Sequence, residues 1–234
     1  MTYEIFEVVL YIIMGMVLLG VIITNRVLNG FGDILWLSDM VSILSFAYVI
    51  FAARHSWFGL LFNFLATCVL IAVDLIQHVW LNAAICIFIS VPFLIFGMIR
   101  WSKNKKSGND DKNLNKLSTK MQIIVWILYA VLCVPFAFLL KALNGNLYVF
   151  DAIYSLGCVV GLILFSFAYI DQFFVFIVAN IFGLVMYILL TIQNTNNLSL
   201  IIIVFIYIIG NIIGFINWRK LLKKDKDIQE TEEE

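Results

Sequence analysis

Eight long apolar runs constrain this chain more than any other feature of its sequence. A bilayer core is crossed by about 20 apolar residues of helix, and runs of that order follow one another along the 234 residues. Their approximate bounds are 4–24, 33–53, 57–74, 80–101, 121–141, 149–170, 173–193 and 198–218. Backbone groups in lipid must be paired within their own segment, and these runs lack the alternation of a membrane barrel. The sequence therefore predicts an all-α integral membrane protein with eight transmembrane helices.

Composition agrees with that class and leaves little room for a soluble domain. Hydrophobic residues make up 63% of the chain and charged residues 13%, against about 45–50% and about 25% in ordinary soluble domains. The first run has no basic residue ahead of it, only Glu4 and Glu7 at its beginning, and it contains no small-residue cleavage site. We therefore expect a retained helix there, not a signal peptide.

Neither the cysteines nor the motifs indicate an enzyme. The four cysteines lie inside apolar runs without CxxC spacing, so we interpret them as packing residues. No Walker, HExxH or GxSxG motif occurs in the sequence. We predict no catalytic residue, no metal and no cofactor.

The basic residues predict an orientation. With both termini in the cytoplasm, every Lys and Arg except Arg26 and Lys141 falls on the cytoplasmic side, which is the side that basic loops prefer. We therefore expect a multi-pass plasma-membrane protein. The loop 102–120 and the tail 219–234 are expected to be solvated and flexible, beside membrane lipid and without a role in nucleic-acid binding.

The chain also contains an internal repeat. The segment HSWFGLLFN, which begins at His55, aligns with QFFVFIVAN, which begins at Gln172, at an offset of 117 residues. The same offset pairs Asn63 with Asn180, Gly97 with Gly214 and Trp101 with Trp218. An even number of helices separates equivalent points, so both halves run in the same direction. We predict a parallel repeat about an axis along the membrane normal.

Some of the repeated residues have a structural interpretation. Tryptophan prefers the membrane interface, so Trp101 and Trp218 are expected to mark the points where helices leave the bilayer. The glycine pairs 157/161 and 210/214 have the spacing of close helix packing. His55, in a turn beside Arg54, is expected to have no special role.

Asn63 and Asn180 are candidate site residues. Each lies about 10 Å into the hydrocarbon, where an amide without a partner costs about 4–8 kcal/mol. The two amides could bond neighbouring helices, or they could face each other across a central cavity. Trp57 and other aromatic residues lie near them in sequence, and aromatic faces beside an amide suit a heteroaromatic ring with polar edges.

Several acidic residues also fall within or beside the apolar runs. Asp39 and Asp151 lie near the beginning of corresponding runs and are weaker candidates for a coupling or gating role. Asp74 and Asp171 lie near the ends of runs, so we interpret them as interface residues.

From Trp36 to Lys220 the chain resembles the PnuC family of vitamin-precursor and nucleoside transporters. The resemblance rests on WFGLLFN, GMIRW, YIDQFFVFIVAN and GFINW, in that order. It implies two three-helix bundles joined by a linking helix, as in the SWEET sugar transporters, with an extra N-terminal helix. The expected divisions are 1–30 (extra helix), 31–101 (first bundle), 102–120 (cytoplasmic loop), 121–148 (linking helix and outer loop), 149–218 (second bundle) and 219–234 (tail).

The resemblance also implies a substrate site. The family's amide falls on Gln172 and its asparagines on Asn63 and Asn180, while its two tryptophans fall on Phe173 and Phe176. Together with Trp57, these form the predicted substrate-binding set. The phenylalanines depart from the pattern of nicotinamide riboside transporters, so a related ligand is favoured.

The implied function is import by facilitated diffusion. We expect a nucleoside-type solute, a (deoxy)nucleoside, to enter the cell and to be trapped by phosphorylation, with a cytoplasmic kinase as functional partner and a homotrimer as the assembly. Nicotinamide riboside is the close alternative, followed by thiamine or riboflavin. A non-transporting membrane subunit is the remaining class.

Overall fold

The computed structural model describes residues 2–29, 33–76, 80–106, 114–143, 147–193 and 198–232, and these residues are helical apart from short connections. Within these ranges, eight spans are long and apolar enough to cross a membrane, which confirms the prediction. The elements are α1 (Thr2–Asn29), α2 (Asp33–Ala53), α3 (Trp57–Ile76), α4 (Trp80–Ile85), η1 (Cys86–Ser90), α5 (Val91–Lys106), α6 (Thr119–Ala142), α7 (Tyr148–Ser166), α8 (Gln172–Gln193) and α9 (Leu198–Glu232).

The fourth span is one helix with a wider turn in its middle. At η1 the N–H of Val91 bonds the carbonyl of Cys86, five residues back, while Ile85 and Val91 keep helical angles. Pro92 follows directly. Because proline has no N–H and its ring crowds the carbonyl four residues back, a π turn beside it lets the helix continue.

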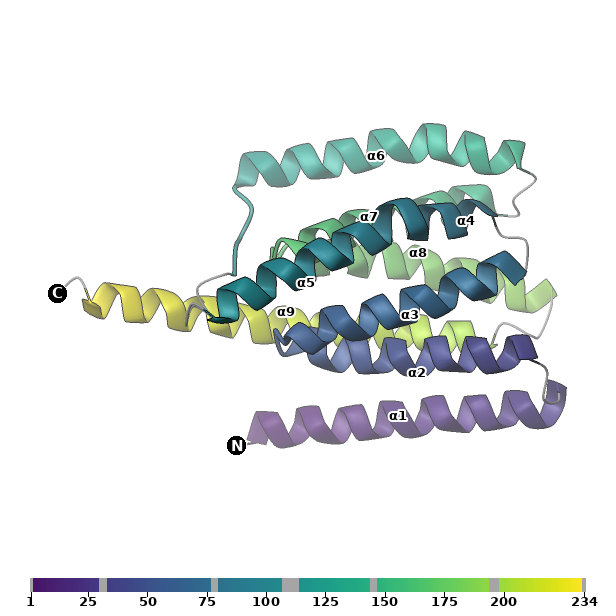
Figure 1. Ribbon diagram of the computed structural model, residues 1–234, viewed down its shortest axis with the longest axis horizontal. Coiled ribbons are helices and arrows are strands. Elements are labelled where there is room, and N and C mark those ends of the chain that lie inside the picture. The colour runs from purple at the N-terminus through teal and green to yellow at the C-terminus, as the bar shows by residue number, and fades with distance from the viewer. Residues whose placement is uncertain are drawn as a thin grey trace.

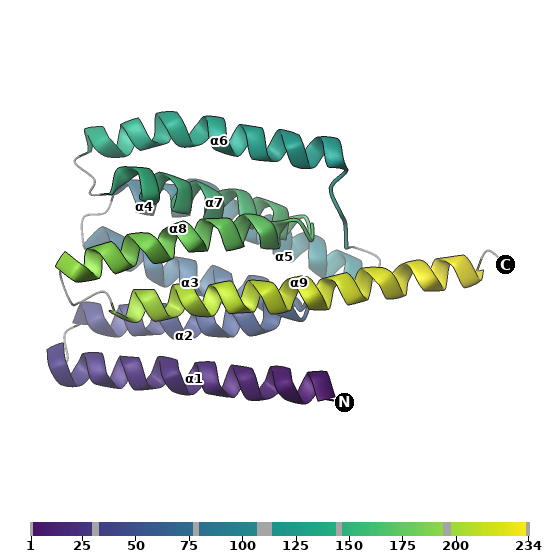
Figure 2. The same ribbon diagram turned by 180° about the vertical axis from the view of Figure 1, so that it is seen from behind.

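The helices lie side by side, with α1 along one edge of the bundle and α6 along the opposite edge (Figure 1). α3 packs against α2 and α5, and α8 packs against α7 and α9. These two groups meet where α2 packs on α9 and α5 on α7. The reverse view shows α9 running alongside α2 (Figure 2).

Both chain termini lie at the same end of the bundle (Figure 1). The turn 54–56, the turn 167–171 and the segment 114–118 connect helices at this end, which we call the termini end.

The predicted run 149–170 is too long, because α7 ends at Ser166. Ala168 has φ 56° and cannot continue the helix. Ala168 and Ile170 are nevertheless buried, in the hydrophobic core at the termini end. The apolar composition of this turn therefore reflects burial in protein and not a longer span.

The prediction of a flexible loop is wrong for residues 114–118. Leu114 is buried in that same core, and Asn115 exchanges backbone bonds with Ala168 (3.0 Å) and Ile170 (2.9 Å). Ser118 caps α6 by accepting a bond from the N–H of Met121. Residues 107–113 lie outside the described ranges. The tail prediction also needs correction, because α9 continues as a helix to Glu232.

The glycine pairs pack as predicted. A Cβ on Gly161 would lie 2.6 Å from the Phe176 ring, and one on Gly214 would lie 2.4 Å from the Phe173 ring. A Cβ on Gly157 would meet the Cβ of Ala179 at 2.5 Å. These glycines allow neighbouring helices and rings to approach closely.

We expect Gly157→Ala to destabilise the fold by about 1–3 kcal/mol, because the added methyl overpacks the contact between α7 and α8. Gly20→Ala is the matched control, since a Cβ there meets nothing within 4 Å. Alanine also favours helix by up to about 1 kcal/mol, so the control should hold or gain stability. Thermal denaturation in detergent measures both, and equal melting temperatures would contradict the packing.

Candidate functional site

Five aromatic side chains close the termini end of the bundle. These residues, which we call the aromatic plug, are His55, Trp101, Phe165, Phe173 and Trp218. The His55 ring lies 4.6 Å from Trp101 and 4.8 Å from Trp218 by ring centroids. The two tryptophan rings lie 5.9 Å apart. The plug thus joins a residue of α5 to one of α9.

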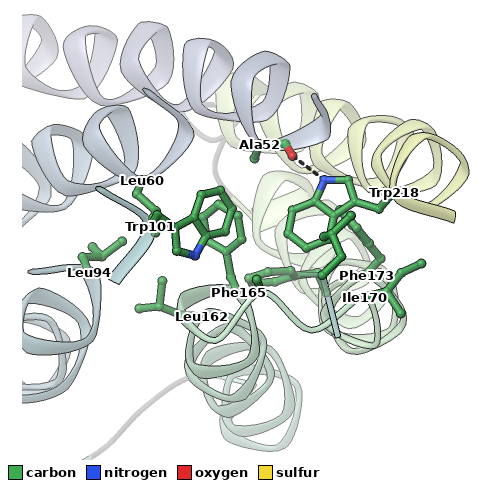
Figure 3. Close-up of a cluster of buried hydrophobic side chains, with 12 residues drawn as sticks. Ala52, Leu60, Leu94, Trp101, Leu162, Phe165, Ile170, Phe173 and Trp218 are labelled. Atoms are coloured by element: carbon green, nitrogen blue, oxygen red, sulfur yellow. Dashed lines mark hydrogen bonds between the residues drawn. The ribbon is translucent and has the colours of Figure 1, made fainter. Parts of the chain in front are cut away.

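The interpretation of Trp101 and Trp218 as membrane-interface anchors is wrong. Trp218 is 0% exposed and Trp101 8% exposed, in the core that also holds Phe165 and Phe173 (Figure 3). The indole N–H of Trp218 donates to the Ala52 carbonyl at 2.9 Å. Helix-end position alone did not distinguish a tryptophan that faces lipid from one that faces the neighbouring helices.

The turn after α2 places His55 in the plug. His55 has φ 53°, an uncommon left-handed conformation for a residue with a side chain. Its N–H donates to the Ala52 carbonyl at 3.1 Å, the same acceptor that Trp218 uses. The expectation that His55 has no special role is therefore wrong, because its ring fills the space between the two tryptophans.

A small pocket lies next to the plug. It is lined by Tyr48, Val49, Ala52 and Ala53 of α2, Phe165 of α7, Gln172 and Phe173 of α8, and Tyr207, Gly210 and Asn211 of α9. Its volume is about 20 Å³, enough for one water molecule. The pocket therefore lies between α2 on one side and α7, α8 and α9 on the other.

Gln172 is the unusual residue of this pocket. Its side chain is 1% exposed, and both amide atoms, Nε2 and Oε1, are buried without a hydrogen-bond partner. An unsatisfied buried polar group costs about 1–3 kcal/mol, so it calls for an explanation such as a bound water or ion, local strain or a functional role. Gln172 thus presents a free donor and a free acceptor to the pocket.

The structure brings four of the six predicted site residues to this region. Gln172 and Phe173 line the pocket. Phe176 belongs to the core around the plug, and Trp57 packs against that core. The indole of Trp57 donates to the Met98 carbonyl at 3.1 Å, which ties α3 to α5.

Asn63 and Asn180 do not line the pocket. Asn180 is 3% exposed and lies on α8 about two turns beyond Gln172. Asn63 is half-buried on α3, a helix that packs against α2 and α5. Their role in binding stays a prediction.

Sequence reasoning missed three polar residues of the pocket, Tyr48, Tyr207 and Asn211. The rings of Tyr48 and Tyr207 lie 6.4 Å apart, and Asn211 Nδ2 donates to the Tyr207 carbonyl at 2.7 Å. Asn211 carried the same signal as Asn63, an amide within an apolar run. The tyrosines gave no such signal, because they occur throughout membrane helices.

The intramembrane acids have local partners. Asp39 pairs with Arg26 at 2.6 Å, and Asp151 accepts from Ser155 at 2.8 Å. Asp74 accepts from Asn82 at 2.7 Å.

Asp171 accepts from Gln122 and from the backbone of Leu117, each at 2.7 Å. Asp74 and Asp171 lie at the ends of spans, as predicted, but both are buried within the fold, so protein partners rather than water surround their carboxylates. Across the ranges that the structure describes, no three His, Cys, Asp or Glu side chains are placed to hold a metal ion.

Known proteins resemble this chain in sequence and in fold. The family described as Nicotinamide mononucleotide transporter matches residues 35–220. The nicotinamide riboside transporter PnuC of Neisseria mucosa is 20% identical over 194 residues, which cover 81% of this chain and 74% of that protein. The crystal structure of the vitamin B3 transporter PnuC has a similar fold, with a TM-score of 0.72 and 20% identity over 94% of this chain and 92% of that chain.

We expect Gln172→Met to raise the stability of the ligand-free protein by about 1–3 kcal/mol, because an apolar side chain of similar size removes the unsatisfied amide. Gln122→Met is the matched control. Its amide bonds Asp171 and the Leu117 carbonyl, so the same substitution should lower stability. Melting temperatures measured in detergent without ligand test both. A lower melting temperature for Gln172→Met would show that the amide has a partner in the folded protein.

Proposed function

Because the chain belongs to the nicotinamide mononucleotide transporter family, we propose that it is a membrane transporter for nicotinamide riboside. This solute is a nucleoside whose base is a cationic pyridinium ring with a carboxamide group. The relatives support it better than the (deoxy)nucleoside that was favoured from Phe173 and Phe176. Nicotinamide riboside is also the close alternative that the sequence predicts.

The unpaired amide of Gln172 is the observation that carries the proposal. A primary carboxamide on the ligand can pair with it through two hydrogen bonds, one in each direction. Both buried atoms would then be satisfied, which removes the cost of leaving them unpaired. A ring without such a pair of groups would leave at least one of the two atoms unsatisfied.

The lining of the pocket suits a cationic ring. Aromatic faces come from Tyr48, Phe165, Phe173 and Tyr207, and none of the lining residues is charged. Aromatic faces attract cations through the ring quadrupole, and more strongly where water is excluded. No basic side chain among the lining residues opposes a positive ligand.

The pocket has to widen to admit the solute. Its volume of about 20 Å³ holds a water molecule and not a nucleoside. The lining residues belong to α2 on one side and to α7, α8 and α9 on the other. Movement of α2 away from these three helices would therefore open the site. This geometry supports transport by relative movement of the two groups around a fixed site.

The proposed transport also implies a membrane, an orientation and partners in the cell. We infer facilitated diffusion across the plasma membrane, with both termini in the cytoplasm, where the basic residues at the termini end would lie. Phosphorylation by a cytoplasmic kinase would trap the product and maintain the gradient. Lipid or neighbouring subunits of a homotrimer would cover the exposed apolar faces, such as those of α1 and α6. The protein itself would have no catalytic role.

We expect nicotinamide riboside to raise the melting temperature of the purified protein, because a ligand of the folded state stabilises it. Deoxynucleosides, thiamine and riboflavin should raise it less at equal concentration. Gln172→Met should weaken binding of nicotinamide riboside by about 10–100-fold, which corresponds to the loss of about 1.4–2.8 kcal/mol. Uptake into proteoliposomes should fall with it. Equal affinity of the variant and the parent for nicotinamide riboside would rule out the amide pair.

We further expect Asn63→Ala and Asn180→Ala to weaken binding without unfolding the protein. Titration of each variant with nicotinamide riboside measures the effect. Asn82→Ala is the control, since its amide bonds Asp74 away from the pocket. Titration curves that match those of the control would assign both asparagines to helix packing.

A further inference from the structure

Helix α1 covers the seam between the two groups of helices. All of α1 precedes the segment 35–220 that matches the family. Its buried face packs against α2 and α9 together, through Tyr11, Met14 and Leu18 of α1, Val49 and Ala53 of α2, and Ile206 and Ile213 of α9. α1 therefore contacts both groups that have to move apart for the pocket to open.

Away from the termini end, α1 is joined to α2. Arg26, in its last turn, donates to Asp39 of α2 at 2.6 Å, and both side chains are about nine-tenths buried. A buried ion pair with this geometry is costly to break. We expect α1 to move with α2.

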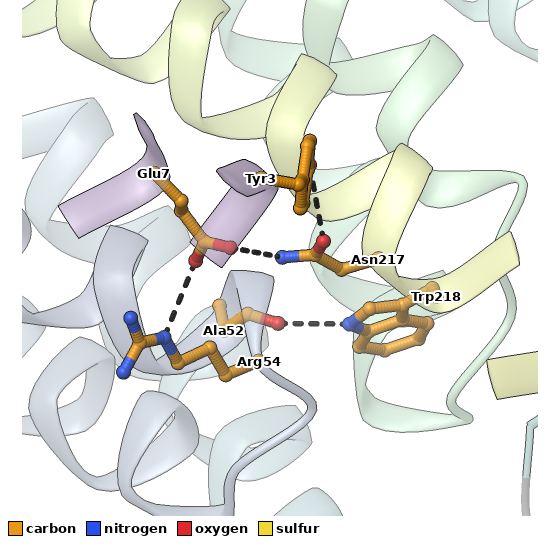
Figure 4. A network of polar contacts seen from close by, with 6 residues as sticks. All are labelled: Tyr3, Glu7, Ala52, Arg54, Asn217 and Trp218. Atoms are coloured by element: carbon orange, nitrogen blue, oxygen red, sulfur yellow. Dashed lines mark hydrogen bonds and ion pairs between the residues drawn. The ribbon is translucent and has the colours of Figure 1, made fainter. Parts of the chain in front are cut away.

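At the termini end, α1 bonds both groups through one carboxylate. Glu7 is 6% exposed. Its Oε1 accepts from Nε of Arg54, in the turn after α2, at 3.2 Å. Its Oε2 accepts from Nδ2 of Asn217, in the apolar span of α9, at 3.3 Å (Figure 4).

Two further contacts support the same bridge. The hydroxyl of Tyr3 donates to Oδ1 of Asn217 at 3.2 Å, so both polar atoms of this amide are bonded to α1. Nζ of Lys220, one turn further along α9, lies 3.3 Å from the centroid of the Tyr3 ring. These contacts cross from α1 to the group that contains α9.

The two residues that Glu7 contacts are adjacent in sequence to residues of the aromatic plug. Arg54 precedes His55, and Asn217 precedes Trp218. We propose that Glu7 is a positioning residue that holds the plug closed, by latching the turn after α2 to α9 across the seam. The latch must release before the rings of His55 and Trp218 can separate.

The geometry of the latch is that of a contact that can break and re-form. Both bonds to Glu7 are longer than the 2.7–2.9 Å typical of charge-assisted bonds. The Arg54 side chain is half exposed, so water can replace its contact with Glu7. The inference rests on the proposed function only in that a solute has to pass the plug.

The test measures how often the plug opens, and it needs no substrate. Ala52→Cys places a thiol in the lining of the pocket, within the core that also holds Trp218, in a background whose four native cysteines are replaced by serine. The reporter is the labelling rate of the purified protein with a charged maleimide. Asn217→Asp sets a second carboxylate against Glu7, and we expect labelling to become about 10-fold faster, which is about 1.4 kcal/mol.

Rescue distinguishes the latch from general loosening of the fold. Adding Glu7→Gln to Asn217→Asp restores an amide–carboxylate bond with donor and acceptor exchanged, and we expect the labelling rate to return toward that of the parent. Asp39→Asn is the matched control, because it weakens the attachment of α1 to α2 without crossing the seam. It should lower the melting temperature and leave labelling unchanged.

Two results would overturn the proposal. One is an unchanged labelling rate in Asn217→Asp, and the other is a labelling rate that follows the melting temperature in every variant, Asp39→Asn included. If Ala52→Cys does not fold, Ser166→Cys is the second reporter, since Ser166 is fully buried beside Gly97 in the seam between α5 and α7. Accelerated and rescued labelling in a protein that does not bind nicotinamide riboside would support the latch and refute the proposed substrate.

Discussion

The contact between Trp218 and the end of α2 holds the two helix groups together around the pocket. The indole donates to the Ala52 carbonyl at 2.9 Å and is 0% exposed. It packs edge-on against Phe173, whose ring fills the space that Gly214 leaves free. Since Ala52 and Phe173 also line the pocket, a single side chain sets the distance between α2, α8 and α9. The aromatic plug and the lining of the pocket are therefore parts of one packed unit.

The buried polar side chains of this fold differ in whether they have hydrogen-bond partners. Acids such as Asp39 and Asp74 find partners nearby, as groups removed from water must. Their positions are thus explained by the fold itself. Gln172 differs, because it is as deeply buried and both of its amide atoms lack a partner. Under the proposed function, a ligand that pairs with this amide would satisfy both atoms.

Much of the fold could be predicted from the sequence, and the errors have a common cause. Hydropathy located the eight spans found in the described part of the chain, because crossing a bilayer requires length and apolar composition that no neighbour can supply. It failed at Ala168 and Ile170, which are apolar because protein covers them, and at Leu114, which lies in a polar stretch but packs into the core. Hydropathy reports removal from water and does not distinguish lipid from protein.

For the candidate site, the sequence by itself determined the membrane class and the spans, and it predicted Gln172 and Phe173 as site residues, which the structure places in the lining of the pocket. These follow from local properties of the chain and from residues that match a family pattern. Only the tertiary structure decided that Trp218 closes the bundle, that Tyr48 and Tyr207 share the pocket, and that Glu7 reaches Arg54 and Asn217. Those contacts join residues up to 210 positions apart. They depend on which helices pack together, and an apolar helix has many faces that lipid or protein could cover equally well.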